Sequence, residues 1–307
     1  MMKDLLKHTI ACRIAGCLAA FCLTFVSCTS TVDDGLQDSR AITFTPAADT
    51  RAAVTGYEDM GDFQVWGWYG GDGTAAPNNV FDGTVVYKDA GWNYTDGVRY
   101  WKAGETYNFY AVYPVNVGTC EDNGTITVTN FDCSQTGNAA VDLMTATATG
   151  ITYTAEQTPQ PVAMKFSHLL SKVNIVATVE GGNATVTKIV FAGMATSGDY
   201  SSTGVWNNTQ KSNFTKETDQ ILNAEGIDLL GDMLLIPQDV SGFTVTVDYT
   251  MDGGEQSSKT VTLPTAISQW QAGQSYKYTL TFKGDNIIFT VNVAAWNHST
   301  GGIITVE

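Results

Sequence analysis

The chain has 307 residues, enough for two domains of ordinary size, each with its own buried core. Charged residues make up only 15% of it and 30 residues are glycine, a composition that favours strands and turns over helices. The formal net charge of −15 at pH 7 opposes binding to phosphate backbones and to anionic lipid surfaces, so we expect no nucleic-acid partner.

Residues 1–27 are predicted to be a signal peptide rather than part of the fold. Three basic residues precede an apolar run, 14–26, that is too short for an ordinary transmembrane helix. The run ends at Cys28, preceded by a small residue, which resembles a bacterial lipoprotein cleavage site. We therefore expect lipid on Cys28. The alternative is a plain secretory signal cleaved near Ser27.

Residues 28–40 are polar and acidic and are predicted to be a flexible tether. A short strand follows at 42–44, where Ile42 and Phe44 share one face, and we expect Pro46 to end it. Arg51 comes next, in a stretch with no periodicity.

The rest of the chain alternates between apolar and polar residues in short runs bounded by turn residues, and no segment keeps a helical period. In the first half the predicted strands are 63–69, 80–87, 92–101, 107–113, 125–131 and 141–144. A polar stretch with prolines at 154–161 is the expected domain boundary. The predicted domains are therefore 41–157 and 158–307. In the second domain the strands are 162–166, 173–179, 186–191, 233–236, 243–249, 261–263, 276–282, 287–293 and 303–306, with a polar loop at 200–213.

One internal repeat indicates that the two halves are related. The pattern W-x-A-G-x-x-Y-x-aromatic begins at Trp101 and again at Trp270, each time before a strongly alternating run. We expect a turn at the glycine that folds the tryptophan over the end of a sandwich. The sequence thus predicts an all-β protein of two tandem β-sandwiches, each of about seven short strands.

Two cysteines remain after the leader, Cys120 and Cys133, and an even pair in an exported chain favours a disulfide. Such a bridge would close a loop of about 14 residues and stabilise the fold by roughly 3 kcal/mol. Two unpaired thiols are the alternative.

No catalytic or metal-binding motif is present, so we predict neither an enzyme nor a bound metal or cofactor. His168 lies on an alternating apolar run, where we expect a histidine that packs in the core or caps it, and not a general base. Trp66 and Trp68 share one face of their strand and could form a platform that stacks on sugars. The alternative is that they pack inside the protein.

The chain resembles the fimbrillin family, the type V pilin subunits of Gram-negative anaerobes. The resemblance is carried, in order, by Ile42–Phe44, Thr50-Arg51-Ala52, Phe63–Trp68, Tyr100-Trp101, Tyr107–Pro114, Asp142–Met144, Phe166–Val173, the repeat at Trp270–Tyr278, and Trp296. It implies two transthyretin-like, Greek-key sandwiches in a lipoprotein precursor anchored to the outer membrane. It also implies proteolysis after an arginine that frees the first strand, and assembly at the cell surface by a donor strand from another fimbrial subunit.

Arg51 is the predicted processing site and Arg40 is the second candidate, because cleavage at Arg51 releases residues 41–47 and cleavage at Arg40 does not. The alternative is that Arg51 is an exposed loop arginine with no such role. The candidate donor is 303–307, which is short for that task. Two functions therefore stay open from the sequence. The first is a stalk, tip or anchor subunit of a fimbrium. The second is a surface lipoprotein that binds a glycan or a host protein and does not polymerise.

Overall fold

The computed structural model describes residues 40–47, 60–70, 76–284, 286–296 and 304–305. Within them the chain is built from strands, and its one helical element is a 3-10 turn at Gly137–Ala139. The prediction of an all-β protein is confirmed. No helix in this part of the chain has the length and apolarity to cross a membrane. The expected leader, Cys28, most of the tether and Arg51 lie outside the described residues.

The first sheet has seven strands: β1 (Phe44–Ala47), β2 (Phe63–Tyr69), β3 (Asn78–Lys88), β4 (Trp92–Asn93), β5 (Thr106–Tyr113), β8 (Met144–Thr152) and β9 (Val162–His168). Their spatial order is β1–β9–β8–β5–β2–β3–β4, and every pair is antiparallel except β1 with β9. β1 also contacts β4 at the opposite end of this order. The sheet therefore curls so that its two edge strands, β1 and β4, meet.

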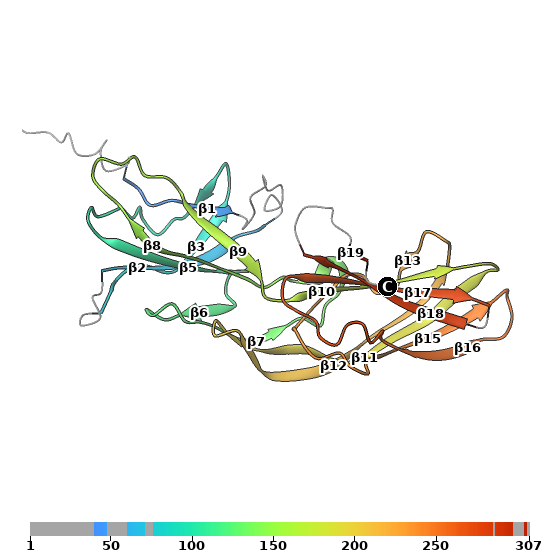
Figure 1. Cartoon of the computed structure of the whole chain (residues 1–307). Coiled ribbons are helices and arrows are strands. Elements are labelled where there is room, and N and C mark those ends of the chain that lie inside the picture. The colour runs from blue at the N-terminus through green and yellow to red at the C-terminus, as the bar shows by residue number, and fades with distance from the viewer. Residues whose placement is uncertain (1–39, 48–59, 71–75, 285, 297–303, 306–307) are drawn as a thin grey trace, which may run out of the picture.

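The other two sheets pack against each other in the C-terminal part of the molecule (Figure 1). The second has the order β16–β15–β11–β7–β6 with β12 also on β11, formed by β6 (Gly118–Cys120), β7 (Ile126–Asp132), β11 (Ala184–Ser201), β12 (Val205–Ile221), β15 (Thr244–Met251) and β16 (Ser257–Thr262). The third has the order β13–β10–β17–β18–β19 with β14 also on β10, formed by β10 (Ser171–Val179), β13 (Ile227–Asp228), β14 (Met233–Leu235), β17 (Gln274–Lys283), β18 (Asn286–Ala295) and β19 (Ile304–Thr305). The Greek-key and transthyretin-like assignment stays a prediction.

Three apolar clusters hold these sheets together. One fills the inside of the curled first sheet, and a second lies between the second and third sheets. The third cluster joins the two halves, because it combines the outer face of the first sheet with β7, β11 and β14. Its buried members are Trp66, Trp68, Val112, Ile126, Val128, Phe131, Cys133, Leu143, Leu170, Ala195, Tyr200, Leu234 and Ile236. The halves therefore share a packed apolar interface.

Strand pairing does not follow the domain boundary expected at 157–158. That boundary separates β8 from β9, which are antiparallel neighbours in the first sheet. β6 and β7, expected in the first domain, instead extend the second sheet, since β7 pairs with β11. By strand pairing the change of sheet comes after His168. The proline-containing stretch at 154–161 connects two strands of one sheet.

The polar loop expected at 200–213 is wrong. This region is the end of β11 and most of β12, which form one long antiparallel hairpin. Most side chains of β12 are exposed, so the strand can be polar while its backbone pairs with β11. An apolar pattern therefore could not reveal it.

The repeated motif forms the same turn in both halves. Gly104 and Gly273 both have the left-handed backbone that favours glycine, with φ of +85° and +69°. In each copy the tyrosine hydroxyl accepts a hydrogen bond from the backbone N–H that follows the tryptophan, at 2.8 Å in the first half and 2.9 Å in the second. Both Trp101 and Trp270 are buried, as the motif predicts.

The two copies differ in how the indole N–H is satisfied. Trp270 Nε1 donates to Tyr278 Oη at 3.0 Å, and burial raises the pKa of Tyr278 to about 12. The counterpart of Tyr278 is Phe109, and Trp101 Nε1 is buried without a hydrogen-bond partner among the described residues.

Replacing Tyr278 with phenylalanine is expected to lower the free energy of unfolding by about 1–3 kcal/mol, because the buried Trp270 N–H loses its acceptor. Urea denaturation of the variant and the parent measures this. The raised pKa keeps the hydroxyl protonated, so the difference should be constant from pH 6 to pH 9. Equal stability of the two proteins would contradict the assigned bond.

Candidate functional site

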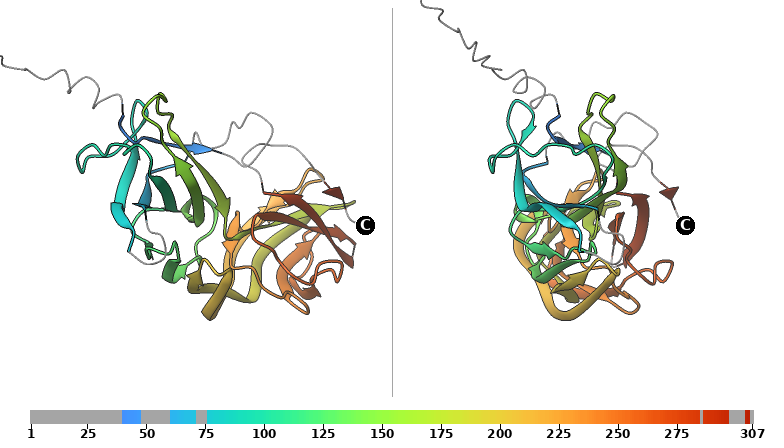
Figure 2. Two further views of the ribbon diagram at one scale, coloured as in Figure 1. Left: turned by 60° about the vertical axis from the view of Figure 1, so that its left-hand side comes forward. Right: turned by 90° about the vertical axis from the view of Figure 1, so that its left-hand side faces the viewer.

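Residues 40–47, here called the seam segment, lie between β9 and the residues that follow β4, and so join the two ends of the first sheet. Residues 40–42 lie against residues 99–101, which follow β4, with an antiparallel bridge between Ala41 and Tyr100. Residues 44–47 form β1 and pair with β9. Figure 2 shows β1 (blue) beside β9 (green) at the end of the molecule where the first sheet lies. The gap that the segment fills is called the seam below.

Hydrogen bonds hold the segment on the β4 side. Ile42 N donates to Arg99 O at 2.8 Å, and Trp101 N donates to Arg40 O at 3.0 Å. Tyr94 adds a side-chain bond, since its hydroxyl donates to Ile42 O at 2.8 Å and accepts from Arg99 N at 3.2 Å. The sequence reading did not single out Tyr94. The only signal for it in the sequence is that Tyr94 is one of the aromatic residues on either side of Asp96-Gly97, a residue pair typical of a hairpin turn.

On the β9 side the pairing is parallel. Val162 N donates to Thr43 O at 2.7 Å, and the register runs from Phe44 opposite Val162 to Ala47 opposite Lys165. In a parallel pair, every second residue of a strand directs its backbone N–H and C=O groups to the same neighbouring strand. In the seam segment these residues are 43, 45 and 47, and the neighbouring strand is β9. Pro46 faces away, where its missing N–H is harmless. This explains why Pro46 lies inside β1 instead of ending the strand.

Two side chains of the segment enter the core of the first sheet. Ile42 is fully buried and Phe44 is 3% exposed, whereas Thr43 between them is exposed. The predicted alternation of this strand is therefore confirmed. Such side chains each contribute about 1.5–3 kcal/mol through burial.

The second half contains a counterpart of the seam segment at residues 238–240. Trp270 N donates to Gln238 O, and Val240 N donates to Ser268 O, both at 2.9 Å. A bridge between residues 239 and 269 corresponds to the one between Ala41 and Tyr100. Residues 238–240 are joined to described strands on both sides. The covalent connection from the seam segment to the rest of its sheet runs through residues 48–59. A single cut there leaves the segment held only by hydrogen bonds and side-chain packing.

The two candidate processing arginines lie on opposite sides of Ile42 and Phe44 in the sequence. Arg51 belongs to the connection 48–59, outside the described residues. Arg40 is the residue whose carbonyl bonds to Trp101, and it precedes both buried side chains of the segment. Cleavage after Arg40 would leave Ile42 and Phe44 attached to the sheet.

The predicted disulfide is wrong, because Cys120 and Cys133 are both free thiols. Cys120 pairs with Ile126 at the turn end of the β6–β7 hairpin. β7 then runs away from that turn for its whole length, about 23 Å at 3.3 Å per residue, before it reaches Cys133. A disulfide needs Cα atoms within about 7 Å. Burial raises the pKa of each thiol to about 12, so both are unreactive at neutral pH.

The sugar platform predicted at Trp66 and Trp68 is also wrong. The two indoles are 4% and 7% exposed, and they pack in the cluster that joins the halves. β2 has one face in the core of the first sheet and the other face in this joining cluster. The alternative interpretation, in which these residues pack inside the protein, is therefore the one that the structure supports.

His168 lies at the junction of the two halves, where it is nearly buried. Its Nδ1 is 2.6 Å from Asp142 Oδ2, and its ring stacks on Trp296 at 3.9 Å between centroids. Three separate parts of the chain thus meet here: the residues just before β8, the end of β9 and the residue that follows β18. His168 therefore makes structural contacts at the end of its strand and is not fully buried in a core.

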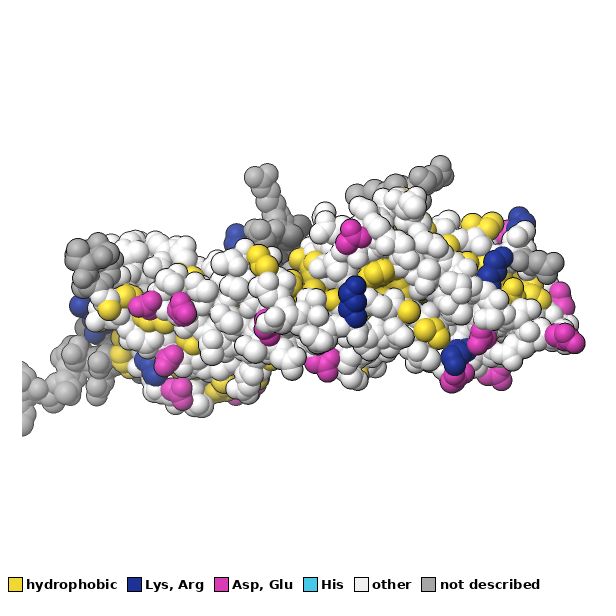
Figure 3. All heavy atoms as spheres, turned by 90° about the horizontal axis from the view of Figure 1, so that it is seen from below, with side chains coloured by type: hydrophobic (Ala, Val, Ile, Leu, Met, Phe, Trp, Pro, Cys, Tyr) yellow, Lys and Arg dark blue, Asp and Glu magenta, His cyan; other side chains and the backbone are white. Residues whose placement is uncertain are grey.

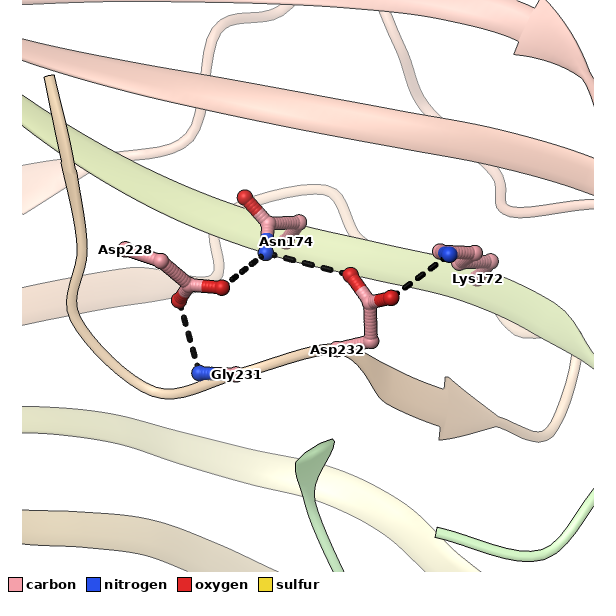
Figure 4. Close-up of polar contacts among 5 residues, drawn as sticks. All are labelled: Lys172, Asn174, Asp228, Gly231 and Asp232. Carbon is pink, nitrogen blue, oxygen red and sulfur yellow. Dashed lines mark hydrogen bonds and ion pairs between the residues drawn. The ribbon is translucent and has the colours of Figure 1, made fainter. Parts of the chain in front are cut away.

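An acidic group in the second half is likewise occupied by structural contacts (Figure 4). Asn174 of β10 donates to Asp228 at 2.7 Å and to Asp232 at 3.1 Å, while Lys172 lies 2.5 Å from Asp232. The other oxygen of Asp228 accepts from Gly231 N at 2.7 Å. The network fixes the loop between β13 and β14 against β10. In the part of the chain that the structure describes, no group of His, Cys, Asp and Glu side chains is arranged to hold a metal ion.

Comparison with known proteins decides the family. A family model described as fimbrillin-like matches residues 50–296, which is most of the chain. The chain belongs to the fimbrillin-like family. A search of curated proteins found no match to this fimbrillin-like chain. The matched region begins after the seam segment, so the segment itself is identified only by its contacts.

Solved structures share the fold of this fimbrillin-like protein. A fimbrial protein from Bacteroides vulgatus is 18% identical with a TM-score of 0.58, and the match covers 84% of this chain and 100% of that one. A “putative cell adhesion protein” from Bacteroides uniformis is 19% identical with a TM-score of 0.54, covering 84% and 99%. A third structure, from Bacteroides ovatus and described in the same words, is 17% identical with a TM-score of 0.57, covering 83% and 96%.

The surface of this fimbrillin-like chain fits its composition. The face drawn in Figure 3 carries scattered carboxylates on both halves, with a few basic side chains between them. No basic stripe follows a strand or groove on this face, which agrees with the net charge of −15. A carboxylate-rich surface favours solubility and opposes indiscriminate contact between copies.

Proposed function

We propose that this protein is a structural subunit of a cell-surface fimbrium, and that a strand from another subunit replaces the seam segment during assembly. Membership in the fimbrillin-like family supports a fimbrial or adhesive role. The related structures named above are described as fimbrial or cell adhesion proteins, which agrees with that role. The observation that carries the proposal is the burial of two side chains, Ile42 and Phe44, on a segment with one covalent connection to its sheet.

The physical argument starts from what removal of the segment leaves. β9 and residues 99–101 would expose unpaired backbone groups, and the core would open where Ile42 and Phe44 were. Addition of a strand restores both, since each backbone pair adds about 1 kcal/mol and each buried side chain more. A subunit that keeps its own segment cannot accept another. Cleavage is therefore the step that commits the subunit to assembly.

The processing site that fits this scheme is Arg51. Cleavage there releases residues 41–47, and the precursor remains closed until it occurs. Lipid on Cys28 would hold the uncleaved precursor at the outer membrane, because the seam segment connects Cys28 to the folded sheet. The same cut would then separate the subunit from its anchor.

Arg51→Ala and Arg40→Ala form a matched pair that tests the proposal. In cells that assemble the fimbrium, we expect Arg51→Ala to abolish the denaturant-resistant ladder of polymers on a gel and to leave a closed monomer. Arg40→Ala should polymerise like the parent. N-terminal sequencing of the surface form should begin at Ala52.

An intact ladder from Arg51→Ala would contradict cleavage at this site. A polymeric subunit that still begins at Cys28 would contradict strand removal altogether.

A further inference from the structure

The seam segment places an aromatic side chain in a cage of three other aromatic rings. Phe44 packs edge-on against Phe81 of β3 at 5.1 Å and 75°, and against Phe109 of β5 at 5.4 Å and 82°. Tyr94 lies on a third side at 6.4 Å. These distances are those of favourable aromatic pairs, each worth more than the area it buries. The cage therefore recognises a ring, whereas the site of Ile42 requires only an apolar side chain.

The cage cannot close when the ring is absent, because contacts other than those with Phe44 hold its walls in place. Phe81 packs against Tyr94 at 5.2 Å and 90°, and the Arg99 guanidinium lies 5.7 Å from the ring of Phe81. Phe109 is held against the backbone of β2, where a Cβ on Gly67 would come within 2.6 Å of it. A smaller side chain at the position of Phe44 would leave a void that the walls cannot fill.

Tyr94 also sets the register of whatever strand occupies the seam. Its hydroxyl donates to the carbonyl of Ile42, two residues before the caged ring, and it is positioned by the backbone N–H of Arg99. A strand bound at this hydroxyl therefore presents its aromatic side chain to the cage only in the pattern aliphatic–x–aromatic. The seam segment has this pattern in Ile42-Thr43-Phe44.

We infer that the seam selects a donor strand with the pattern aliphatic–x–aromatic, supplied by a different subunit and not by residues 303–307 of another copy of this chain. Those residues are Ile-Ile-Thr-Val-Glu and contain no ring. Val306 follows Ile304 at the spacing that the cage requires, but it would fill only part of the space that Phe44 fills. The inference rests on the proposed strand replacement and specifies the partner for it.

Peptide exchange on the cleaved protein tests the selection. The chain from Thr29 onward, carrying Arg40→Lys, is cut by an arginine-specific protease, and mass spectrometry confirms a single cut after Arg51. The segment, now cut from the rest of the chain, stays bound through its hydrogen bonds and buried side chains and is then displaced by fluorescent peptides. The peptides are residues 40–48, the same peptide with Phe44→Leu or Phe44→Ala, residues 301–307, and residues 301–307 with Val306→Phe.

We expect residues 40–48 to displace the segment, Phe44→Leu to bind about tenfold more weakly, and Phe44→Ala about a hundredfold or more weakly. The peptide 301–307 should bind as poorly as Phe44→Ala, and Val306→Phe should improve it at least tenfold. Equal binding of the parent and Phe44→Leu peptides would overturn the inference, as would tight binding of unmodified 301–307. If no peptide displaces the segment, strand replacement itself fails, which is a separate result.

Discussion

Replacing Trp66 with alanine is expected to lower the free energy of unfolding by about 3–5 kcal/mol. The indole is buried in the cluster that joins the two halves, so its removal leaves a cavity between the outer face of the first sheet and β7. Val98→Ala is the matched control, because Val98 is 54% exposed and its truncation should change stability by less than about 0.5 kcal/mol. Urea denaturation measures both differences.

The same variant tests the sugar-platform interpretation of Trp66. If Trp66 were a sugar-stacking residue, its loss would abolish binding to a glycan array and leave the free energy of unfolding unchanged. If Trp66 is a buried packing residue, its loss instead lowers the free energy of unfolding. An unchanged unfolding midpoint in Trp66→Ala would contradict the packing described above.

Replacing Phe44 with alanine should cost about 3–5 kcal/mol in the uncleaved protein, because the caged ring contacts Phe81, Phe109 and Tyr94. Thr43→Ala, at the exposed position next to it, should cost far less. Thermal unfolding of the two variants compares them directly. We also expect Phe44→Ala to release the seam segment faster after cleavage at Arg51, measured as the rate of peptide loss by size-exclusion chromatography.

A Phe44→Ala protein as stable as Thr43→Ala would show that the cage contributes little to the closed state. The selection of an aromatic donor would then lose its energetic basis. Both variants keep the connection 48–59 intact, so the comparison does not depend on whether Arg51 is the processing site.

Local patterns predicted the strands that lie over an apolar core. β5, β15 and β17 all appear where alternating residues indicated them, because the side chains of one face of each are buried and the period of two is visible. β12 was missed because its side chains are mostly exposed. Its strand character comes from pairing with β11, which leaves no trace in hydrophobicity.

The two wrong predictions about sites depended on contacts that a local pattern does not show. The disulfide assumed that two cysteines near in sequence lie near in space, and the tryptophan platform assumed that the face of β2 with Trp66 and Trp68 is exposed. The 7 residues of β7 run from the turn of its hairpin with β6 toward Cys133, which separates that residue from Cys120. β7 also pairs with β11, and its buried side chains pack in one cluster with Trp66 and Trp68. Long-range pairing of this kind cannot be deduced from composition or spacing.

By itself the sequence determined the all-β class, the related turns at Trp101 and Trp270, and the burial of Ile42 and Phe44. These follow from local alternation and from glycine at a left-handed turn, which are properties of neighbouring residues. Only the tertiary structure decided that residues 40–47 bridge both edges of one curled sheet, and that Phe81, Tyr94 and Phe109 surround a single ring. The reason is physical: closure of a sheet brings residues more than fifty positions apart into contact, and no local pattern encodes which edges meet.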